Sequence, residues 1–261
     1  MIARYAVMGN PIAHSLSPDI HATFARQTMR TMVYDKIFVD LDQFEAQVLS
    51  FFEGGGQGLN ITLPFKQRAF MLSDLQTQRS QQAGVANTLW MHEGKLYADN
   101  TDGIGLIKDL SRHVSVADAR VLLIGAGGAA RGIVHALLDE KPKEVVVVNR
   151  SQDKAEALQR LAPGISRAPT MADVSGAFDI LVNATSSSLS ANETPFPVSW
   201  LQGSPFCYDL SYSKTRDTPF VVWARQSGAH AIDGYGMLVE QAAESFYIWH
   251  GVRPLGARCS G

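Results

Sequence analysis

Lys66 and Asp102 are the residues whose types and surroundings most favour proton-transfer chemistry. Lys66 ends the segment 60–66 (NITLPFK), in which Pro64 stops a predicted strand, so that Lys66 falls in the first turn of a helix. The positive end of a helix dipole disfavours an ammonium, which suits a group that donates and accepts a proton. Asp102, in the segment 100–103 (NTDG), lies where two predicted domains join and could orient Lys66. The structural alternatives are a surface lysine after a proline turn and an aspartate that caps the next helix.

A glycine-rich turn follows the apolar run 120–124 and precedes a helical pattern. It places Gly125, Gly127 and Ala130 at the spacing of a dinucleotide-binding turn. The first glycine permits the tight turn, the second lets the backbone approach a pyrophosphate, and the helix N-terminus presents free N–H groups. A purely structural turn is the alternative, but the succession of strand, turn, helix and strand favours a cofactor site. We therefore assign dinucleotide binding to Gly125, Ala126, Gly127, Gly128 and Ala129.

The residues at the end of the next predicted strand favour NADP(H) over NAD(H). Asn149, Arg150 and Ser151 stand where NAD-binding proteins usually carry Asp or Glu. A guanidinium pairs with the 2′-phosphate of NADP, whereas a carboxylate would repel it. Lys154 could add positive charge to the same phosphate. The alternative for Arg150 and Lys154 is a role as solvated surface cations.

The elements that must position these residues alternate as in α/β proteins. Six short apolar runs predict strands, at residues 5–9, 36–40, 58–63, 120–124, 145–148 and 179–183. Between them, Ser17 and Pro18 predict a helix start with Ser17 as N-cap, and a helical stripe ends at Gly54. A last helical pattern begins after Gly234 and is expected to pack back on the first domain. Its helical positions are Met237, Leu238, Gln241, Ala242, Ser245, Phe246 and Trp249.

The chain is therefore expected to be a two-domain α/β protein. Residues 1–101 form an N-terminal α/β substrate-binding domain, on which residues 235–261 pack back. Residues 102–234 form a Rossmann-like, doubly wound NADP-binding domain, because their apolar strands alternate with helices.

Composition narrows the class of protein. The chain has 261 residues, of which 46% are hydrophobic, and a formal net charge of −2, which excludes a disordered chain and gives no general attraction to nucleic acid or an anionic membrane. No apolar run reaches the roughly 18 residues of a membrane helix, and no signal peptide is expected. Cys207 and Cys259 make neither a disulfide framework nor a thiolate metal site. We expect a cytoplasmic protein with a small-molecule substrate and no metal, either a monomer or a homodimer.

Together these segments resemble the shikimate dehydrogenase family. The likeness extends over nearly the whole chain, and the motifs occur in the order of the family. The matching segments are residues 5–17 (YAVMGNPIAHSLS), 60–66 (NITLPFK), 86–88 (ANT), 99–106 (DNTDGIGL), 124–131 (IGAGGAAR), 149–151 (NRS), 183–187 (NATSS), 208–212 (YDLSY), 218–220 (TPF) and 233–243 (DGYGMLVEQAA).

The resemblance implies an activity and a set of roles. The activity is the reversible, NADPH-dependent reduction of 3-dehydroshikimate to shikimate in aromatic amino-acid biosynthesis, with Lys66 as general acid and base and Asp102 orienting it. Ser15, Ser17 and Tyr212 would contact the substrate carboxylate. Leu210 and Gly234 would line the nicotinamide site. The ring hydroxyls would be contacted by Thr62, Lys66, Asn87, Asp102 and Gln241.

Some positions depart from the family or stay outside its chemistry. Ser188 replaces a common glycine near the expected nicotinamide site, and Gln78 replaces a common acidic residue near the cofactor. His14 is expected to stay outside the proton relay, and His21 and His113 are expected on the surface.

Two other functions are weighed against this one. A quinate/shikimate dehydrogenase with looser cofactor choice should show an acidic residue near 149–151 or a threonine in place of Ser15 or Ser17. A non-catalytic dinucleotide-sensing homologue should lack the lysine–aspartate pair. The chain shows neither departure.

Overall fold

The computed structural model describes residues 2–185 and 196–256, which divide into two compact units. Unit 1 comprises residues up to Gly105 and from Leu238 onward, and unit 2 comprises Leu106–Met237. The boundaries fall inside helices α5 (Asp102–Leu110) and α9 (Tyr235–His250), a few residues after the sequence-based boundaries. Both helices run without interruption through the division, so that no local sequence signal marks it.

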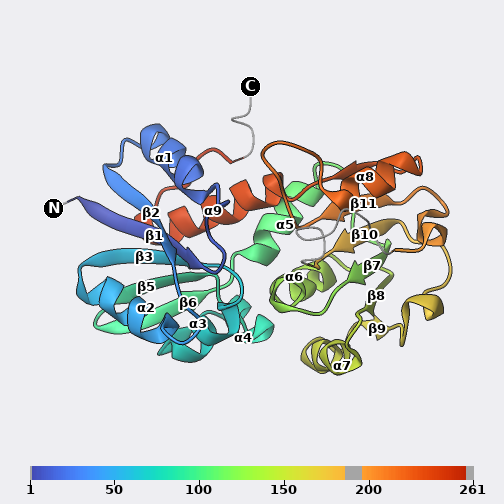
Figure 1. Cartoon of the computed structure of the whole chain (residues 1–261), viewed down its shortest axis with the longest axis horizontal. Helices are drawn as coiled ribbons and strands as arrows, with labels where there is room; N and C mark the ends of the chain where they lie inside the picture. The colour runs from blue at the N-terminus through green and yellow to red at the C-terminus, as the bar shows by residue number, and fades with distance from the viewer. Residues whose placement is uncertain (1, 186–195, 257–261) are drawn as a thin grey trace. The chain divides into compact units, whose positions relative to one another are not determined.

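The sheet of unit 1 is mixed (Figure 1). Its strand order is β2-β1-β3-β5-β6-β4, and β1 pairs in parallel with both β2 and β3. Strand β5 runs antiparallel to β3 and β6. The strands are β1 (Ala3–Gly9), β2 (Met32–Phe38), β3 (Gly56–Ile61), β4 (Leu75–Gln76), β5 (Thr88–His92) and β6 (Lys95–Asp99).

The hairpin β5–β6 is a feature that the apolar patterns above do not predict. Its turn places Glu93 at φ 50° and Gly94 at φ 75°, the positive angles of a two-residue type I′ turn. Because glycine adopts such angles without strain, the Glu93-Gly94 pair was the available sequence signal. The hairpin matters for function because it places Asn87, just before β5, next to Asp99, at the end of β6. The Asn87 N–H donates to the Asp99 carbonyl over 3.0 Å.

Helices cover both faces of this sheet. Helix α1 lies above the strands in Figure 1, with α2 and α3 below them. Phe44, Val48 and Ala69 of α2 and α3 pack with Met8 and Leu59 of the sheet in one buried core. On the other face, Tyr5 contacts Trp249 of α9, with ring centroids 5.0 Å apart. Besides its parts of α5 and α9, the described part of the unit contains helices α1 (Ser17–Gln27), α2 (Phe44–Glu53), α3 (Lys66–Leu72) and α4 (Gln78–Ala83).

The start of α1 differs from the sequence-based prediction. Ser17 is the first residue of the helix and Leu16 occupies the N-cap position, so that Ser17 is not the cap. The Ser17 N–H instead donates to the Ser15 side-chain oxygen over 3.3 Å. Ser15 therefore satisfies a free N–H of the first turn, the role that had been predicted for Ser17.

His21 lies in the core and not on the surface as predicted, whereas His14 and His113 are exposed. Its ring stacks on Tyr34 with centroids 4.1 Å apart and contacts Phe24 and Trp249. A histidine carries no sequence sign of burial, and the helical positions of Ile20 and Phe24 were the only indication of this face. Burial, with a smaller contribution from the nearby His250, lowers the pKa of His21 to about 3.

Unit 2 has the doubly wound topology that the sequence predicts. Its strands are parallel in the order β12-β11-β10-β7-β8-β9, which is the order 6-5-4-1-2-3 along the chain. The strands are β7 (Arg120–Ile124), β8 (Glu144–Val148), β9 (Ser166–Arg167), β10 (Ile180–Asn183), β11 (Phe206–Asp209) and β12 (Ala231–Ile232).

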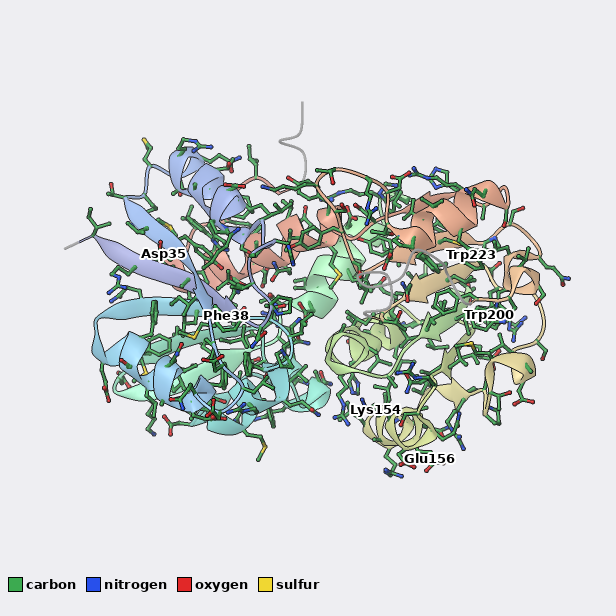
Figure 2. All side chains as sticks on the ribbon, in the orientation of Figure 1. Asp35, Phe38, Lys154, Glu156, Trp200 and Trp223 are labelled. Atoms are coloured by element: carbon green, nitrogen blue, oxygen red, sulfur yellow. The ribbon has the colours of Figure 1, made fainter. Side chains whose placement is uncertain are left out.

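Helices α6 (Gly128–Asp139) and α7 (Gln152–Leu161) pack on one face of this sheet, and α8 (Pro219–Gln226) packs on the other. Trp200 lies in the core under α8, and Trp223 of α8 packs against the same core (Figure 2). The short 3-10 turns η1 (Met171–Asp173) and η3 (Val198–Leu201) complete the unit. Across the described residues, no helix combines the length and the apolar character needed to span a bilayer.

The buried His21 predicts a specific loss of stability in acid. The unfolded chain takes up a proton at this side chain below pH 6.5, whereas the folded protein takes it up only near pH 3, so the free energy of unfolding falls as the pH falls through that window. His250, whose pKa burial lowers to about 4, adds to the same effect. We expect His21→Leu to reduce the loss of unfolding free energy between about pH 7.5 and pH 5 by about 2 kcal/mol.

Urea unfolding at the two pH values measures this difference. The exposed His92 of unit 1 provides the control, because His92→Gln should leave the pH dependence unchanged. An unchanged pH dependence in His21→Leu would show that the buried ring is not the acid-sensitive group.

Candidate active site

Lys66 and Asp102 form an ion pair in unit 1. Strand β3 ends at Ile61, and Lys66 is the first residue of α3, as the proline in the segment predicts. Asp102 is the first residue of α5, where a carboxylate is favoured by the helix dipole. The Lys66 Nζ donates to Asp102 Oδ2 over 2.5 Å. The Asp102 carboxylate therefore does two things: it pairs directly with Lys66, and it interacts favourably with the N-terminus of α5.

The pair is largely removed from water. The Asp102 side chain is 7% exposed and the Lys66 side chain 18% exposed. Electrostatic attraction is stronger in such surroundings than at an open surface, and the remaining exposure leaves the ammonium accessible from one side. A lysine held in this way can transfer a proton to a neighbouring oxygen and recover it from water.

Asn87 fixes the other carboxylate oxygen. Its Nδ2 donates to Asp102 Oδ1 and to Gln241 Oε1, over 3.0 Å in each case, and approaches Thr101 Oγ1 at 2.8 Å. Its Oδ1 accepts the Thr101 N–H over 2.8 Å. Lys66, Asn87, Asp102 and Gln241 are thus four predicted site residues that the fold brings into one hydrogen-bonded cluster.

Arg79 fixes the elements that carry this cluster. It donates to both carboxylate oxygens of Asp99, over 3.0 and 2.6 Å, and to Glu244 of α9 over 3.2 Å. Asp99 also accepts the Asn100 N–H over 2.7 Å, which sets the backbone just before Asp102. Because Asp99 and Glu244 are buried carboxylates, this pairing holds α4, β6 and α9 together around the site.

The other predicted substrate residues of unit 1 lie outside that cluster. Among the described residues, no hydrogen bond joins the half-buried Thr62 side chain to it. Ser15 and Ser17 lie at the N-terminus of α1 and are linked to each other. Since the Ser15 oxygen accepts an N–H, its own O–H remains available as a donor, and two hydroxyls at a helix N-terminus can hold an anion.

The glycine-rich turn of unit 2 has the backbone geometry of a dinucleotide site. Gly125 has φ +110°, and an added Cβ would lie 3.1 Å from the backbone of Ala184, which follows β10. The turn therefore lies between β7 and β10, where the strand order reverses and α/β sheets bind ligands. Gly127 is the N-cap of α6, and a Cβ there or at Gly128 would meet nothing within 4 Å. This leaves open space in front of the first-turn N–H groups, so the turn fits a pyrophosphate.

The cations after β8 are free to meet a phosphate. Arg150 and Lys154 are both exposed, and Lys154 lies on α7 (Figure 2). Asn149 and Ser151 are half-buried, and the Asn149 Nδ2 donates to the Ser151 carbonyl over 2.8 Å. No carboxylate follows this strand until Asp153, in α7. The residues present therefore fit a cofactor that carries a 2′-phosphate.

The predicted nicotinamide residues lie together at the end of β11. An added Cβ at Gly234 would lie 2.4 Å from the Leu210 carbonyl oxygen, so this approach requires glycine. Asp209 holds the loop, because its buried carboxylate accepts from Asn183 over 3.0 Å and from Thr218 over 2.6 Å. Tyr212 is half-buried in the same loop.

Other predicted positions contribute less to the site. Gln78 is exposed at the start of α4, and Ser188 lies outside the described residues. Among the residues that the structure describes, no group of three or more His, Cys, Asp or Glu could hold a metal ion.

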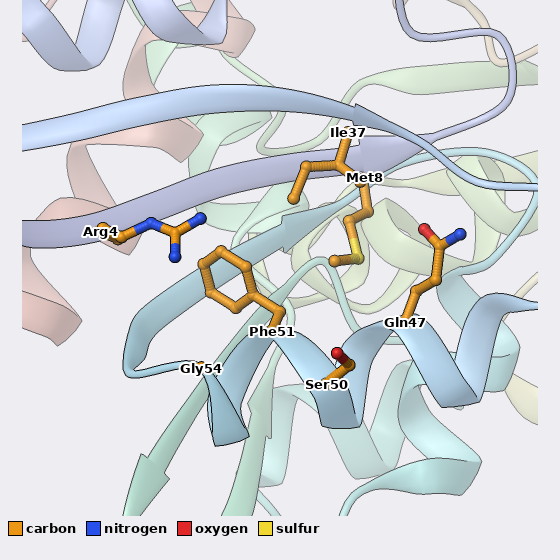
Figure 3. Close-up of a pocket in the computed structure, with 7 residues that line it drawn as sticks. All are labelled: Arg4, Met8, Ile37, Gln47, Ser50, Phe51 and Gly54. Atoms are coloured by element: carbon orange, nitrogen blue, oxygen red, sulfur yellow. The ribbon is translucent and has the colours of Figure 1, made fainter.

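A surface pocket of about 360 Å³ lies between α2 and strands β1 and β2 (Figure 3). None of the predicted site residues lines it, so it offers none of the groups that the predicted chemistry needs. It is lined by Arg4, Met8, Ile37, Gln47, Ser50, Phe51 and Gly54.

Four further residues join the cluster without having been predicted for it. Thr101 and Asn60 bond Asn87 directly, Thr88 Oγ1 lies 3.0 Å from Asn87 Oδ1, and Ser245 contacts Thr88 and Thr101. Asn60, Thr88 and Thr101 stand in motifs already singled out, and Ser245 follows Gln241 by one helical turn. That spacing was the signal for Ser245, but a serine on a helix face does not by itself indicate a polar partner.

Comparisons with known proteins agree with this geometry. The family described as the shikimate dehydrogenase substrate binding domain matches residues 7–89, and the shikimate / quinate 5-dehydrogenase family matches residues 108–194. The shikimate 5′-dehydrogenase C-terminal domain matches residues 234–255.

Individual relatives match the chain over nearly its whole length. An NADP(+) shikimate dehydrogenase of Legionella pneumophila (strain Corby) is 53% identical over 254 residues, which cover 97% of this chain and 96% of that protein. The crystal structure of an Ael1 enzyme from Pseudomonas putida is 46% identical, with a TM-score of 0.87 over 97% of this chain and 95% of that one.

A third relative is a shikimate 5-dehydrogenase of Thermus thermophilus, solved in complex with NADP(H) and shikimate. It is 30% identical, with a TM-score of 0.88 over 97% of this chain and 95% of that one. The matching family models and these relatives show that the chain belongs to the shikimate dehydrogenase family, and its ion pair and dinucleotide turn agree with this.

Proposed function

We propose that the chain is an NADP-dependent shikimate dehydrogenase that reversibly reduces 3-dehydroshikimate to shikimate. The observation that carries the proposal is the Lys66–Asp102 pair, held at 2.5 Å and further oriented by Asn87. A dinucleotide turn followed by Arg150 supplies the matching cofactor site. The Legionella relative named above is an NADP(+) shikimate dehydrogenase that matches the chain over nearly its full length.

The substrate is an anion with several ring hydroxyls, and the site residues match those groups. Ser15 and Ser17 would hold the carboxylate at the N-terminus of α1, together with Tyr212. The hydroxyls would meet the neutral groups of Thr62, Asn87 and Gln241 and the polar atoms of Lys66 and Asp102. Neutral partners suit a polyol, because each unmatched buried polar group costs about 1–3 kcal/mol.

Lys66 would carry the proton of the reaction. Bound NADPH supplies the hydride to the ring carbon. The Lys66 ammonium donates a proton to the ketone oxygen as negative charge develops there, so that an alcohol forms. The neutral amine then recovers a proton from water through its exposed side. Asp102 attracts the ammonium and holds it in place, and in the reverse direction Lys66 accepts the hydroxyl proton.

The cofactor would be held by the residues of unit 2. The N–H groups at Gly127, Gly128 and Ala129 would bind the pyrophosphate, with Gly125 and Ala126 forming the turn. Arg150 would pair with the 2′-phosphate, with Asn149, Ser151 and Lys154 beside it. Leu210 and Gly234 would line the nicotinamide.

We place the reaction in the reducing cytoplasm. The chain has only two cysteines. One of them, Cys207, is buried, and burial raises the pKa of its thiol to about 12, so that it stays protonated and unreactive. A chain without a disulfide framework suits a reducing compartment.

Crossing two substrates with two cofactors tests the proposal. With Ser15 and Ser17 present and no carboxylate at 149–151, we expect oxidation of shikimate with NADP⁺ to exceed the other three combinations of shikimate or quinate with NADP⁺ or NAD⁺ by at least about tenfold in kcat/KM, the effect of about 1.4 kcal/mol. Comparable turnover of quinate would establish the broader quinate/shikimate enzyme instead. No turnover of either would favour a dinucleotide sensor.

Replacing Lys66 tests its role as proton carrier. We expect Lys66→Ala to lower kcat about 10²- to 10⁴-fold, the range for loss of a general acid, while NADPH still binds as judged by its fluorescence. The exposed neighbour provides a control, since Gln67→Ala should leave kcat within about twofold. Near-normal turnover in Lys66→Ala would assign the proton to another group.

Replacing Arg150 tests the choice of cofactor. We expect Arg150→Glu to raise the KM for NADP⁺ by about 10- to 100-fold, because an attraction to the 2′-phosphate becomes a repulsion. The KM for NAD⁺, which lacks that phosphate, should stay nearly constant. Arg160→Glu, at the other end of α7, is the matched control and should change neither value. An equal change in the KM for NADP⁺ and for NAD⁺ would show that Arg150 does not recognise the 2′-phosphate.

A further inference from the structure

A second layer of buried polar side chains lies behind Asn87. Asn60, Thr88 and Ser245 come from β3, β5 and α9, and each is at most 5% exposed. None of them belongs to the groups assigned above to substrate or cofactor. Buried polar groups at this depth require partners, so their hydrogen bonds account for their presence.

Ser245 connects all the elements of this layer. Its Oγ accepts from Asn60 Nδ2 over 2.9 Å and lies 2.7 Å from Thr88 Oγ1 and 3.3 Å from Thr101 Oγ1. Its one proton can go to Thr88 Oγ1 or to the Gln241 carbonyl, which lies 3.1 Å away and one turn earlier in α9. When Ser245 donates to Thr88, the Thr88 hydroxyl keeps its own proton for Asn87, so these groups form a continuous chain of hydrogen bonds.

The two threonines then determine how the Asn87 amide is turned. Asn87 Oδ1 accepts the Thr101 N–H over 2.8 Å, and it also accepts the Thr88 hydroxyl over 3.0 Å when Ser245 donates to Thr88. With the oxygen fixed on that side, the NH₂ group must face Asp102 and Gln241. The opposite orientation would place the amide oxygen against the Asp102 carboxylate, two acceptors without a proton between them.

We infer that Ser245 is a positioning residue for the proposed dehydrogenase reaction: its hydroxyl holds Thr88 and Thr101 so that the Asn87 amide orients Asp102 toward Lys66. The inference rests on the proposed function. A purely packing role would not need the hydroxyl, because the neighbouring buried positions of α9 are Ala242 and Ala243. If the Ser245 hydroxyl bonded only a carbonyl of its own helix, it would contribute little to the stability of the protein.

Replacing Ser245 with alanine removes the oxygen without adding volume. We expect Ser245→Ala to lower kcat/KM for shikimate about 5- to 30-fold, as for one buried hydrogen bond, with most of the loss in kcat. The affinity for NADP⁺ should not change. Thr88→Val, which is nearly isosteric, should act in the same direction.

A double-mutant cycle separates positioning from simple loss of stability. If Ser245 acts through Asn87, then Ser245→Ala should change kcat/KM by no more than about twofold in an Asn87→Ala background. Ser73→Ala is the matched control, because Ser73 is also buried in unit 1 and donates to the Phe70 carbonyl over 2.8 Å. It should lower the stability while leaving kcat and KM within about twofold.

The outcomes are distinguishable. Suppose that the wild-type protein is active on shikimate. The positioning role alone would then be overturned if Ser245→Ala were equally active, or if the effects of Ser245→Ala and Asn87→Ala on kcat/KM were additive. A wild-type protein inactive on shikimate and NADP⁺ would overturn the proposed function and this inference with it.

Discussion

The contact between Lys66 and Asp102 is the interaction around which the polar side chains of the site in unit 1 are arranged. A carboxylate that is 7% exposed loses much of its hydration, and a nearby ammonium must replace it. Such a pair adds little net stability, because desolvation offsets much of the attraction. Its presence therefore points to a role in chemistry more than in stability. The neutral amide of Asn87 completes the hydrogen bonding of the carboxylate without adding charge, so that the positive charge beside Asp102 comes from Lys66, the proposed proton carrier.

Unit 2 meets a different constraint, the approach of a diphosphate to backbone N–H groups. The strand order leaves a crevice between β7 and β10, and the turn that enters it must avoid the backbone of Ala184. Gly125 allows that close approach, while Ala130 is fully buried against the sheet. The two small residues thus have separate tasks, one facing the neighbouring loop and one facing the core. Under the proposed function, recognition of the 2′-phosphate is left to Arg150, which is exposed.

The parts of the fold that follow regular periodicity were predictable from sequence. The apolar runs at β7, β8 and β10 indicated strands buried on both faces, and the proline in the segment 60–66 placed Lys66 at the start of a helix. The hairpin β5–β6 was missed because both of its strands contain exposed residues, so neither forms a continuous apolar run like those of β7 and β8. The burial of His21 was missed because it depends on rings from distant segments, such as Tyr34 and Trp249.

The same limit applies to the site. Types and spacing indicated Lys66 and Asp102, and the family resemblance indicated Gln241, but the role of Ser245 emerges only when α9 is packed behind Asn87. Its partners come from segments 185 residues apart in the sequence, as in the bond from Asn60. Within unit 1 the charged pair is held by neutral amides, which are held in turn by hydroxyls of the core. Only the first of these layers is charged, and the hydroxyls of Thr88, Thr101 and Ser245 are fully buried, so the orientation of the reacting groups is set by neutral hydrogen bonds inside the core.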